Sequence, residues 1–192
     1  MPALPTFKRV ITGHDARGRA VTTDAAPTPH VFPLQAVPGT VFHELWNSQG
    51  SPVPIDNAGD PCDRPLKLGP APQGSVLRVV DIPPDSQHSG LSPEAAAAAF
   101  AEIGQAQAGT GDATSRHALM HRTETLDYGV VLEGEVWLVL DDEEIHLTRG
   151  DVVVQRGTNH AWSNRTEQPA RMLFVLLDGR YADELVNVEA AR

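Results

Sequence analysis

The sequence predicts an all-β fold, a small barrel of jelly-roll type with extra N-terminal strands and one short helix. From residue 114 onward, short apolar-rich runs alternate with Gly or Asp turns, as expected for closely spaced antiparallel strands. The 16 prolines are too many for a helical bundle. Antiparallel strands that must cover two faces close into a barrel or a double-sheet sandwich.

The first third of the chain is predicted to form short strands separated by residues that interrupt secondary structure. Phe7 to Thr12 and Arg19 to Thr23 flank a polar, Gly-containing turn and predict a hairpin, and Val41 to Trp46 predicts a third strand. The segment Ser48 to Gly74 is rich in Pro, Gly and Asp, so it predicts an irregular arm. We expect this arm to wrap a neighbouring subunit or to cover the mouth of the barrel.

One segment carries helix signals. Ser92 is an N-cap residue and Pro93 suits the first helical position, and an Ala-rich run continues to about Gln107. The helix should pack on a sheet. Strands are expected before and after it, at Ser75 to Ile82, His117 to Thr123, Tyr128 to Leu132, Glu135 to Leu140, Glu144 to Leu147, Asp151 to Gln155 and Arg171 to Leu177.

Length and composition limit the function classes. A chain of 192 residues is about one domain, in which we expect residues 1–74 to extend a barrel of residues 75–192. The formal charge of −10 disfavours nucleic acid and anionic lipid as partners. The single cysteine, Cys62, excludes an internal disulfide, and no apolar run approaches the roughly 20 residues that cross a bilayer. We expect a soluble, cytoplasmic protein.

Two groups of histidine, acidic and glycine residues occur between residues 120 and 164. The first group contains His121, Thr123, Asp127 and Gly134, and the second contains Gly150, Gly157, His160 and Asn164. They resemble the paired motifs of the cupin superfamily, a His-x-His pair followed by Glu and Gly, and a Gly followed by Pro-x-Gly, His and Asn. Thr123 replaces the second His and Asp127 replaces Glu. Gln155 and Arg156 stand where the second motif has proline.

The resemblance implies a cupin-type barrel with a divalent metal. Here two imidazoles and a carboxylate, His121, Asp127 and His160, match the donor set that suits Fe(II) and accepts Mn, Ni, Co or Zn. Glu124 is an alternative carboxylate ligand if the turn before Asp127 is tight. Each ligand also has a structural alternative, a surface histidine, a histidine bonded to its own loop or an acid that accepts backbone donors.

Other residues are candidates for the substrate pocket and for proton transfer. By strand alternation, Thr123 and Gly129 share the inward face with the ligands, and Gly129 leaves space for a ring-sized substrate. Trp162 follows His160 by two positions and should share its direction, and Arg171 is a candidate for holding an anionic substrate. Glu124 and Tyr128 are the nearest candidates for moving protons, although Tyr128 should face away from Asp127.

Together these observations predict a metal-dependent enzyme that acts on a small organic molecule. The metal would polarise a substrate oxygen or activate dioxygen, and the resemblance admits a dioxygenase, decarboxylase, isomerase, lyase or hydrolase. The alternative is a non-catalytic barrel that binds a small molecule. By the same resemblance we expect a homodimer.

Overall fold

The computed structural model describes residues 4–112 and 114–185, and its elements are mostly strands. The N-terminal strands are β1 (Arg9–His14), β2 (Ala20–Ala26), β3 (Val31–Pro33), β4 (Val41–Ser48) and β5 (Ser75–Ile82). The C-terminal strands are β6 (Thr125–Glu133), β7 (Glu135–Val139), β8 (Glu144–Thr148), β9 (Val152–Arg156), β10 (Ala161–Ser163) and β11 (Ala170–Asp178). The helices are α1 (Pro93–Glu102) and the 3-10 turns η1 (Asp85–Gln87) and η2 (Asp183–Leu185).

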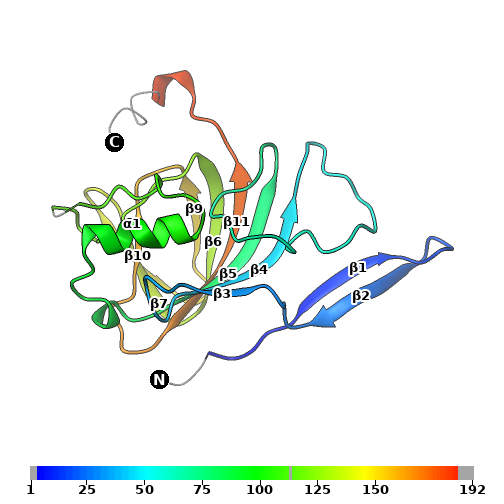
Figure 1. The fold of residues 1–192 in the computed structure, drawn as a ribbon, viewed down its shortest axis with the longest axis horizontal. Helices are drawn as coiled ribbons and strands as arrows, with labels where there is room; N and C mark the ends of the chain where they lie inside the picture. Colours follow the sequence, from blue (N-terminus) through cyan, green and yellow to red (C-terminus); the bar gives the residue numbers. More distant parts are fainter. Residues whose placement is uncertain (1–3, 113, 186–192) are drawn as a thin grey trace.

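Two facing sheets form the barrel. The larger has six strands in the order β3-β4-β5-β11-β6-β9, and the smaller has three in the order β10-β7-β8 (Figure 1). Their inward faces share one hydrophobic core, which includes Val80 of β5, Val136 and Leu138 of β7, and Phe174 of β11. The predicted all-β jelly-roll architecture with one short helix is therefore confirmed.

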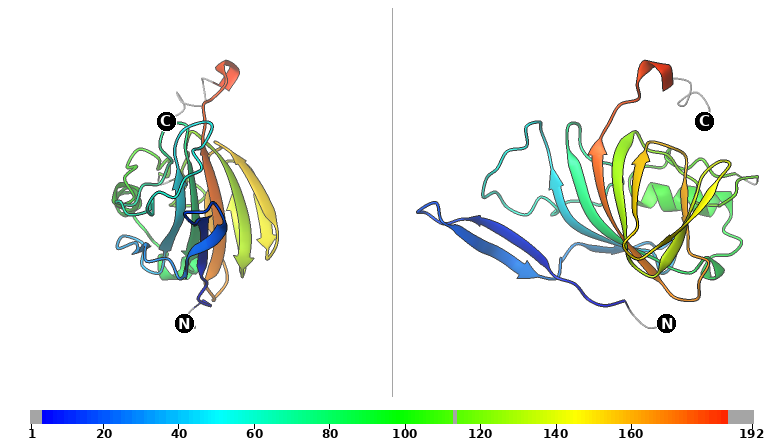
Figure 2. Two further views of the ribbon diagram at one scale, coloured as in Figure 1. Left: turned by 90° about the vertical axis from the view of Figure 1, so that its right-hand side faces the viewer. Right: turned by 180° about the vertical axis from the view of Figure 1, so that it is seen from behind.

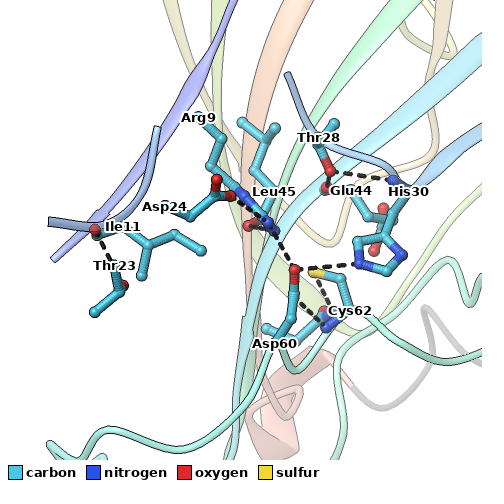
Figure 3. A network of polar contacts seen from close by, with 11 residues as sticks. Arg9, Ile11, Thr23, Asp24, Thr28, His30, Glu44, Leu45, Asp60 and Cys62 are labelled. Carbon is cyan, nitrogen blue, oxygen red and sulfur yellow. Dashed lines mark hydrogen bonds and ion pairs between the residues drawn. The ribbon is translucent and has the colours of Figure 1, made fainter. Parts of the chain in front are cut away.

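The N-terminal hairpin projects from the body. Strands β1 and β2 form a separate two-stranded sheet that points away from the barrel, on the side opposite α1 (Figure 2). Arg9 anchors its base, because its guanidinium contacts Asp24 at 3.0 Å and Asp60 at 2.7 Å and donates to the carbonyl of Leu45 in β4 (Figure 3). One buried cation thus ties the hairpin and the arm to the barrel.

Several predicted elements agree closely with the structure. Strand β5 has the predicted limits, the N-terminal hairpin is present, and the arm between β4 and β5 has no helix or strand. The Ser92 hydroxyl caps α1 by accepting a hydrogen bond from the amide of Ala95. The helix ends at Glu102, earlier than expected, because Gly104 at φ 70° terminates it.

One predicted strand is wrong. Residues 117–123 do not form a strand, because their backbone groups bond partly to the loop that follows α1 and partly to His160. Arg122 donates to the carbonyl of Ala108, and Thr110 donates to the carbonyl of Met120. Only His121 makes isolated strand-like bridges. The three-residue strands β3 and β10 were not predicted, since such short runs carry no periodicity.

No helix in the described part of the chain is long and apolar enough to span a membrane. The division of the chain at residue 74 remains a prediction.

Candidate active site

A largely apolar cavity of about 140 Å³ lies between the two sheets and α1. Its apolar wall includes Phe42 of β4, Val80 of β5, Phe100 of α1, Trp162 of β10 and Phe174 of β11. Among these side chains stand a few polar ones, His121, Thr123, Asp127, His160 and Arg78. Such a concave site with few convergent polar groups is the usual form of a small-molecule site.

His121 and His160 are adjacent in this cavity. The amide of His121 donates to the carbonyl of His160 at 2.8 Å, and the amide of His160 donates to the carbonyl of His121 at 2.9 Å. The two ring centroids are 4.2 Å apart. The structure therefore brings together the two imidazoles that the sequence suggested, through a single antiparallel bridge.

The hydrogen bonds of both rings fix their tautomers. His121 Nδ1 lies 3.0 Å from the carbonyl of Leu119, and His160 Nδ1 lies 2.9 Å from the carbonyl of Thr158. A carbonyl only accepts, so each Nδ1 carries the proton, and Nε2 keeps its lone pair in the neutral ring. Burial lowers the pKa of His121, and burial together with His121 lowers the pKa of His160 well below its usual value. Both rings are therefore neutral donors of the kind that metals bind.

Asp127 projects from β6 into the same cavity and is 7% exposed. Burial raises the pKa of its carboxyl to about 6, while a hydrogen bond from Thr125 and the charge of Arg78 oppose the rise. Its Oδ1 is buried without a hydrogen-bond partner. An orphaned carboxylate oxygen in the same cavity as two free imidazole nitrogens fits a divalent cation in donor type.

The spacing of the three donors is less compact than their type suggests. Asp127, His121 and His160 do not form a set whose potential ligand atoms all lie within 4.8 Å of one another. Among the described residues, only Asp85, His88 and His117 form such a set. The two imidazole rings are adjacent, but with Asp127 they form a less compact set than Asp85, His88 and His117.

The group of Asp85, His88 and His117 is a network of polar contacts around one carboxylate. The amide of Leu119 donates to His117 Nδ1 at 3.1 Å, so the proton of the neutral ring is on Nε2, which lies 3.6 Å from Asp85 Oδ1. A protonated Nε2 cannot also bind a metal. Ser163 donates to the same carboxylate at 2.6 Å, so Asp85 serves chiefly to hold β10 and the loop carrying His117.

Of the predicted pocket residues, Thr123 and Trp162 line the cavity. Gly129 faces inward, but Phe174 occupies the space beside it, with Cε1 only 3.1 Å from the position that a Cβ would take. The glycine thus makes room for Phe174 and not for a substrate.

Arg171 lies elsewhere, on the outer face of the large sheet. Its guanidinium binds Asp81, with Nε 2.5 Å from Oδ1 and Nη2 2.8 Å from Oδ2, and it lies over the ring of Phe7. It does not line the cavity. The predicted role of Arg171 in holding substrate is corrected to that of an internal ion pair.

The two predicted proton carriers also lie outside the cavity. Glu124 accepts a hydrogen bond from the amide of Tyr181 at 2.8 Å at the surface. Tyr128 is 40% exposed on the outer face of β6. Neither the catalytic assignment of this pair nor the alternative of Glu124 as a metal ligand gains support from their positions.

Two buried charged residues were not identified from the sequence, Arg78, which lines the cavity, and its partner Glu44. Arg78 of β5 is 1% exposed and Glu44 of β4 is 3% exposed, and Arg78 Nε lies 2.8 Å from Glu44 Oε1. Strand alternation gives a signal for Arg78, because it shares the face of Val76 and Val80 in a strand whose other face is covered as well. A cation in that register must find partners inside the protein.

The sequence is similar to proteins with a cupin domain. A family model described as "Cupin domain" matches residues 107–176. "Phomopsin biosynthesis cluster protein C'" of Diaporthe leptostromiformis is 38% identical over 187 residues, 93% of this chain and 82% of that protein. "Cupin-domain-containing oxidoreductase virC" of Hypocrea virens is 31% identical over 92% of this chain and 78% of that protein. A solved Cupin_2 domain of an XRE family transcriptional regulator from Enterobacter cloacae covers 74% of this chain and 99% of its own, with 16% identity and a TM-score of 0.38.

Proposed function

The chain belongs to the cupin superfamily, and from that premise we propose that it is a cupin oxidoreductase acting on a small organic molecule held beside His121 and His160. The observation that carries the proposal is the pair of neutral imidazoles in an apolar cavity, each with Nδ1 bonded to a backbone carbonyl and Nε2 left free. Relatives named as cupin-domain-containing oxidoreductases support the reaction class.

His121 and His160 would hold a divalent metal, with Asp127 as the third side chain. When bound there, such a metal supplies Lewis acidity toward a substrate oxygen or redox chemistry with dioxygen. The apolar walls exclude water, which strengthens every polar interaction within the cavity. Asp127, whose carboxyl has a pKa of about 6 without a metal, would offer such a metal an ionised oxygen at Oδ1 near neutral pH.

Metal analysis of single variants tests the proposal. The protein is purified without added metal, and its metal content is measured by elemental analysis, alongside the variants His121→Gln and His160→Gln. His146→Gln is the matched control, because His146 is an exposed histidine paired with Glu135 on the smaller sheet. We expect a bound metal in the wild type and in the control, and its loss in both cavity variants with circular dichroism unchanged.

Two further measurements test where the metal binds and whether the protein turns over a substrate. Loss of metal in His88→Gln but not in His121→Gln would move the metal to the Asp85 group and overturn the assignment. Retention of metal in both His121→Gln and His160→Gln would do the same. A panel of phenols, β-diketones and keto acids under oxygen with Fe(II) then tests turnover, and binding without turnover would instead favour a non-catalytic binding barrel.

The homodimer also remains a proposal. Sedimentation equilibrium of the purified chain measures its mass in solution, and a monomer at micromolar concentration would contradict it.

A further inference from the structure

Arg78 has an unused donor at the cavity. Its Nη2 donates to the carbonyl of Lys67 at 2.6 Å, and its Nε faces Glu44 at 2.8 Å. Neither Nε nor Nη1 makes a hydrogen bond, but Nε has the carboxylate of Glu44 beside it, whereas the buried Nη1 has no partner of either kind. A buried guanidinium group without an acceptor is costly, because the N–H has lost its water and gained nothing in exchange.

Arg78 is one of the residues that line the cavity. Arg78 lies opposite Phe174 in the register of β5 with β11, and both side chains line the cavity. The guanidinium carbon lies 5.4 Å from the centroid of the Phe42 ring, which is also in the cavity wall. Packing against that ring, the hydrogen bond of Nη2 to Lys67 and the ion pair of Nε with Glu44 hold the guanidinium in place, so its orientation is set before any ligand arrives.

The charges around Arg78 indicate what kind of ligand group would accept a hydrogen bond from its Nη1. Glu44 already neutralises Arg78, and both side chains are buried. A carboxylate ligand at Nη1 would place a second negative charge beside the Arg78–Glu44 pair, where no second cation balances it, and burial of an unpaired charge is strongly unfavourable. A neutral carbonyl oxygen satisfies the N–H without adding charge.

The cavity volume limits the rest of the molecule. An engineered apolar cavity of about 150 Å³ binds benzene, and the cavity here measures about 140 Å³. Its wall of Phe42, Phe100, Trp162 and Phe174 suits a single ring with a short substituent.

We propose that Arg78 anchors the substrate, and that the substrate is a neutral, ring-sized carbonyl compound whose oxygen accepts a hydrogen bond from Arg78 Nη1. This assignment rests on the proposed function only in taking the cavity as the substrate site, and it is independent of the metal. Arg78 then sets which end of the molecule faces the two imidazoles. It is a specificity-determining residue that touches the substrate.

A series of matched probes tests the assignment by calorimetry on the full chain treated with a chelator. Ethylbenzene, acetophenone and benzoate have similar size and differ in having no acceptor, a neutral carbonyl and a charged carboxylate. We expect acetophenone to bind about 10-fold more tightly than ethylbenzene, and benzoate about 10-fold more weakly than acetophenone.

The variant Arg78→Lys keeps the charge beside Glu44 and removes Nη1. We expect it to bind acetophenone and ethylbenzene equally, with ethylbenzene affinity within about 3-fold of the wild type. Arg64→Lys is the control, because Arg64 bonds to Asn47 and does not line the cavity, and it should keep the wild-type preference. The wild-type series alone decides the matter if Arg78→Lys does not fold.

The outcomes separate the two proposals. Equal binding of acetophenone and ethylbenzene by the wild type, or a preference retained in Arg78→Lys, overturns the role of Arg78 and leaves the cavity as the substrate site. Tighter binding of benzoate than of acetophenone overturns the choice of a neutral ligand. If neither neutral probe binds, both the role of Arg78 and the cavity as substrate site are refuted. Metal analysis of His121→Gln and His160→Gln would still test the imidazole pair.

Discussion

His121 and His160 exchange both of their backbone hydrogen bonds, although 39 positions separate them in the chain. Residues that pair in this way in an antiparallel bridge direct their side chains to the same side. Here the result is two rings 4.2 Å apart. The position of the ring pair is therefore set by the main chain, and the tautomers are set by the carbonyls of Leu119 and Thr158.

Gln155 positions His160 indirectly. Its Nε2 donates at 3.0 Å to the Thr158 carbonyl, the same oxygen that accepts from His160 Nδ1. We expect Gln155→Ala to weaken metal binding roughly 10-fold to 100-fold, because partners of this kind orient a ligand ring. Competition with a coloured chelator measures the affinity, and Gln107→Ala, at an exposed position, should leave it unchanged. An unaltered affinity in Gln155→Ala would show that the loop holds His160 without this bond.

Asp127→Asn should stabilise the metal-free protein near neutral pH. The carboxyl has a pKa of about 6 in the fold against 3.8 when unperturbed. Because the pKa of this carboxyl is raised in the folded state, its contribution to the free energy of unfolding is fully present below the unfolded pKa. That contribution is lost as the pH rises through 6. The loss is about 3 kcal/mol. Urea unfolding should show the variant more stable than the wild type at pH about 7.5, with the difference gone by about pH 4. A difference independent of pH would contradict this cause.

Glu44→Gln should destabilise the fold by roughly 3–5 kcal/mol, because it leaves Arg78 as a buried cation without its counter-charge. The double variant Glu44→Gln with Arg78→Met should recover part of this loss, since it removes both charges. Denaturant unfolding measures each free energy. Glu167→Gln, an exposed acid, is the control and should change it by less than about 0.5 kcal/mol. Equal effects of Glu44→Gln and the control would mean that the ion pair contributes nothing.

Gly129→Ala should reduce the binding of ring-sized probes. The added methyl group would lie 3.1 Å from Phe174 Cε1, so the ring must shift by a few tenths of an ångström toward the cavity that it lines. We expect a destabilisation of about 1–3 kcal/mol and a several-fold weaker binding of acetophenone. Thermal unfolding and calorimetry measure the two effects. Gly59→Ala is the control, because a methyl group there meets open space and should change neither stability nor probe binding. Gly18 is unsuitable as a control, because its φ of 74° would strain an alanine.

Local sequence signals predicted the elements that local physics determines. Strand β5 lies between Gly74 and Pro83, which mark both of its ends. Helix α1 starts with Ser92, an N-cap residue, followed by Pro93, whose ring fixes φ at a helical value. The family motifs predicted His121 and His160 as partners, and strand alternation predicted that Tyr128 faces outward.

The remaining features depend on contacts between distant segments. The pairing of Glu44 with Arg78 follows from the register of β4 with β5, which shifts at a bulge between Glu44 and Trp46. No local signal encodes that register. Likewise, the segment before β6 pairs with the loop after α1, which the alternation of its residues does not reveal. Neighbouring side chains in a strand point to opposite faces, so the inward position of Met172 implies that Arg171 points outward. This position could have been predicted from the sequence.

The mutual amide-to-carbonyl bonds between residues 121 and 160 use no side-chain atom. Any two amino acids other than proline at these positions would be presented next to each other in the cavity on the same scaffold. The barrel is therefore a frame in which the pair can be exchanged, for example for two cysteines or for a cysteine and a histidine, to change which metals the proposed site would favour without redesigning the strands.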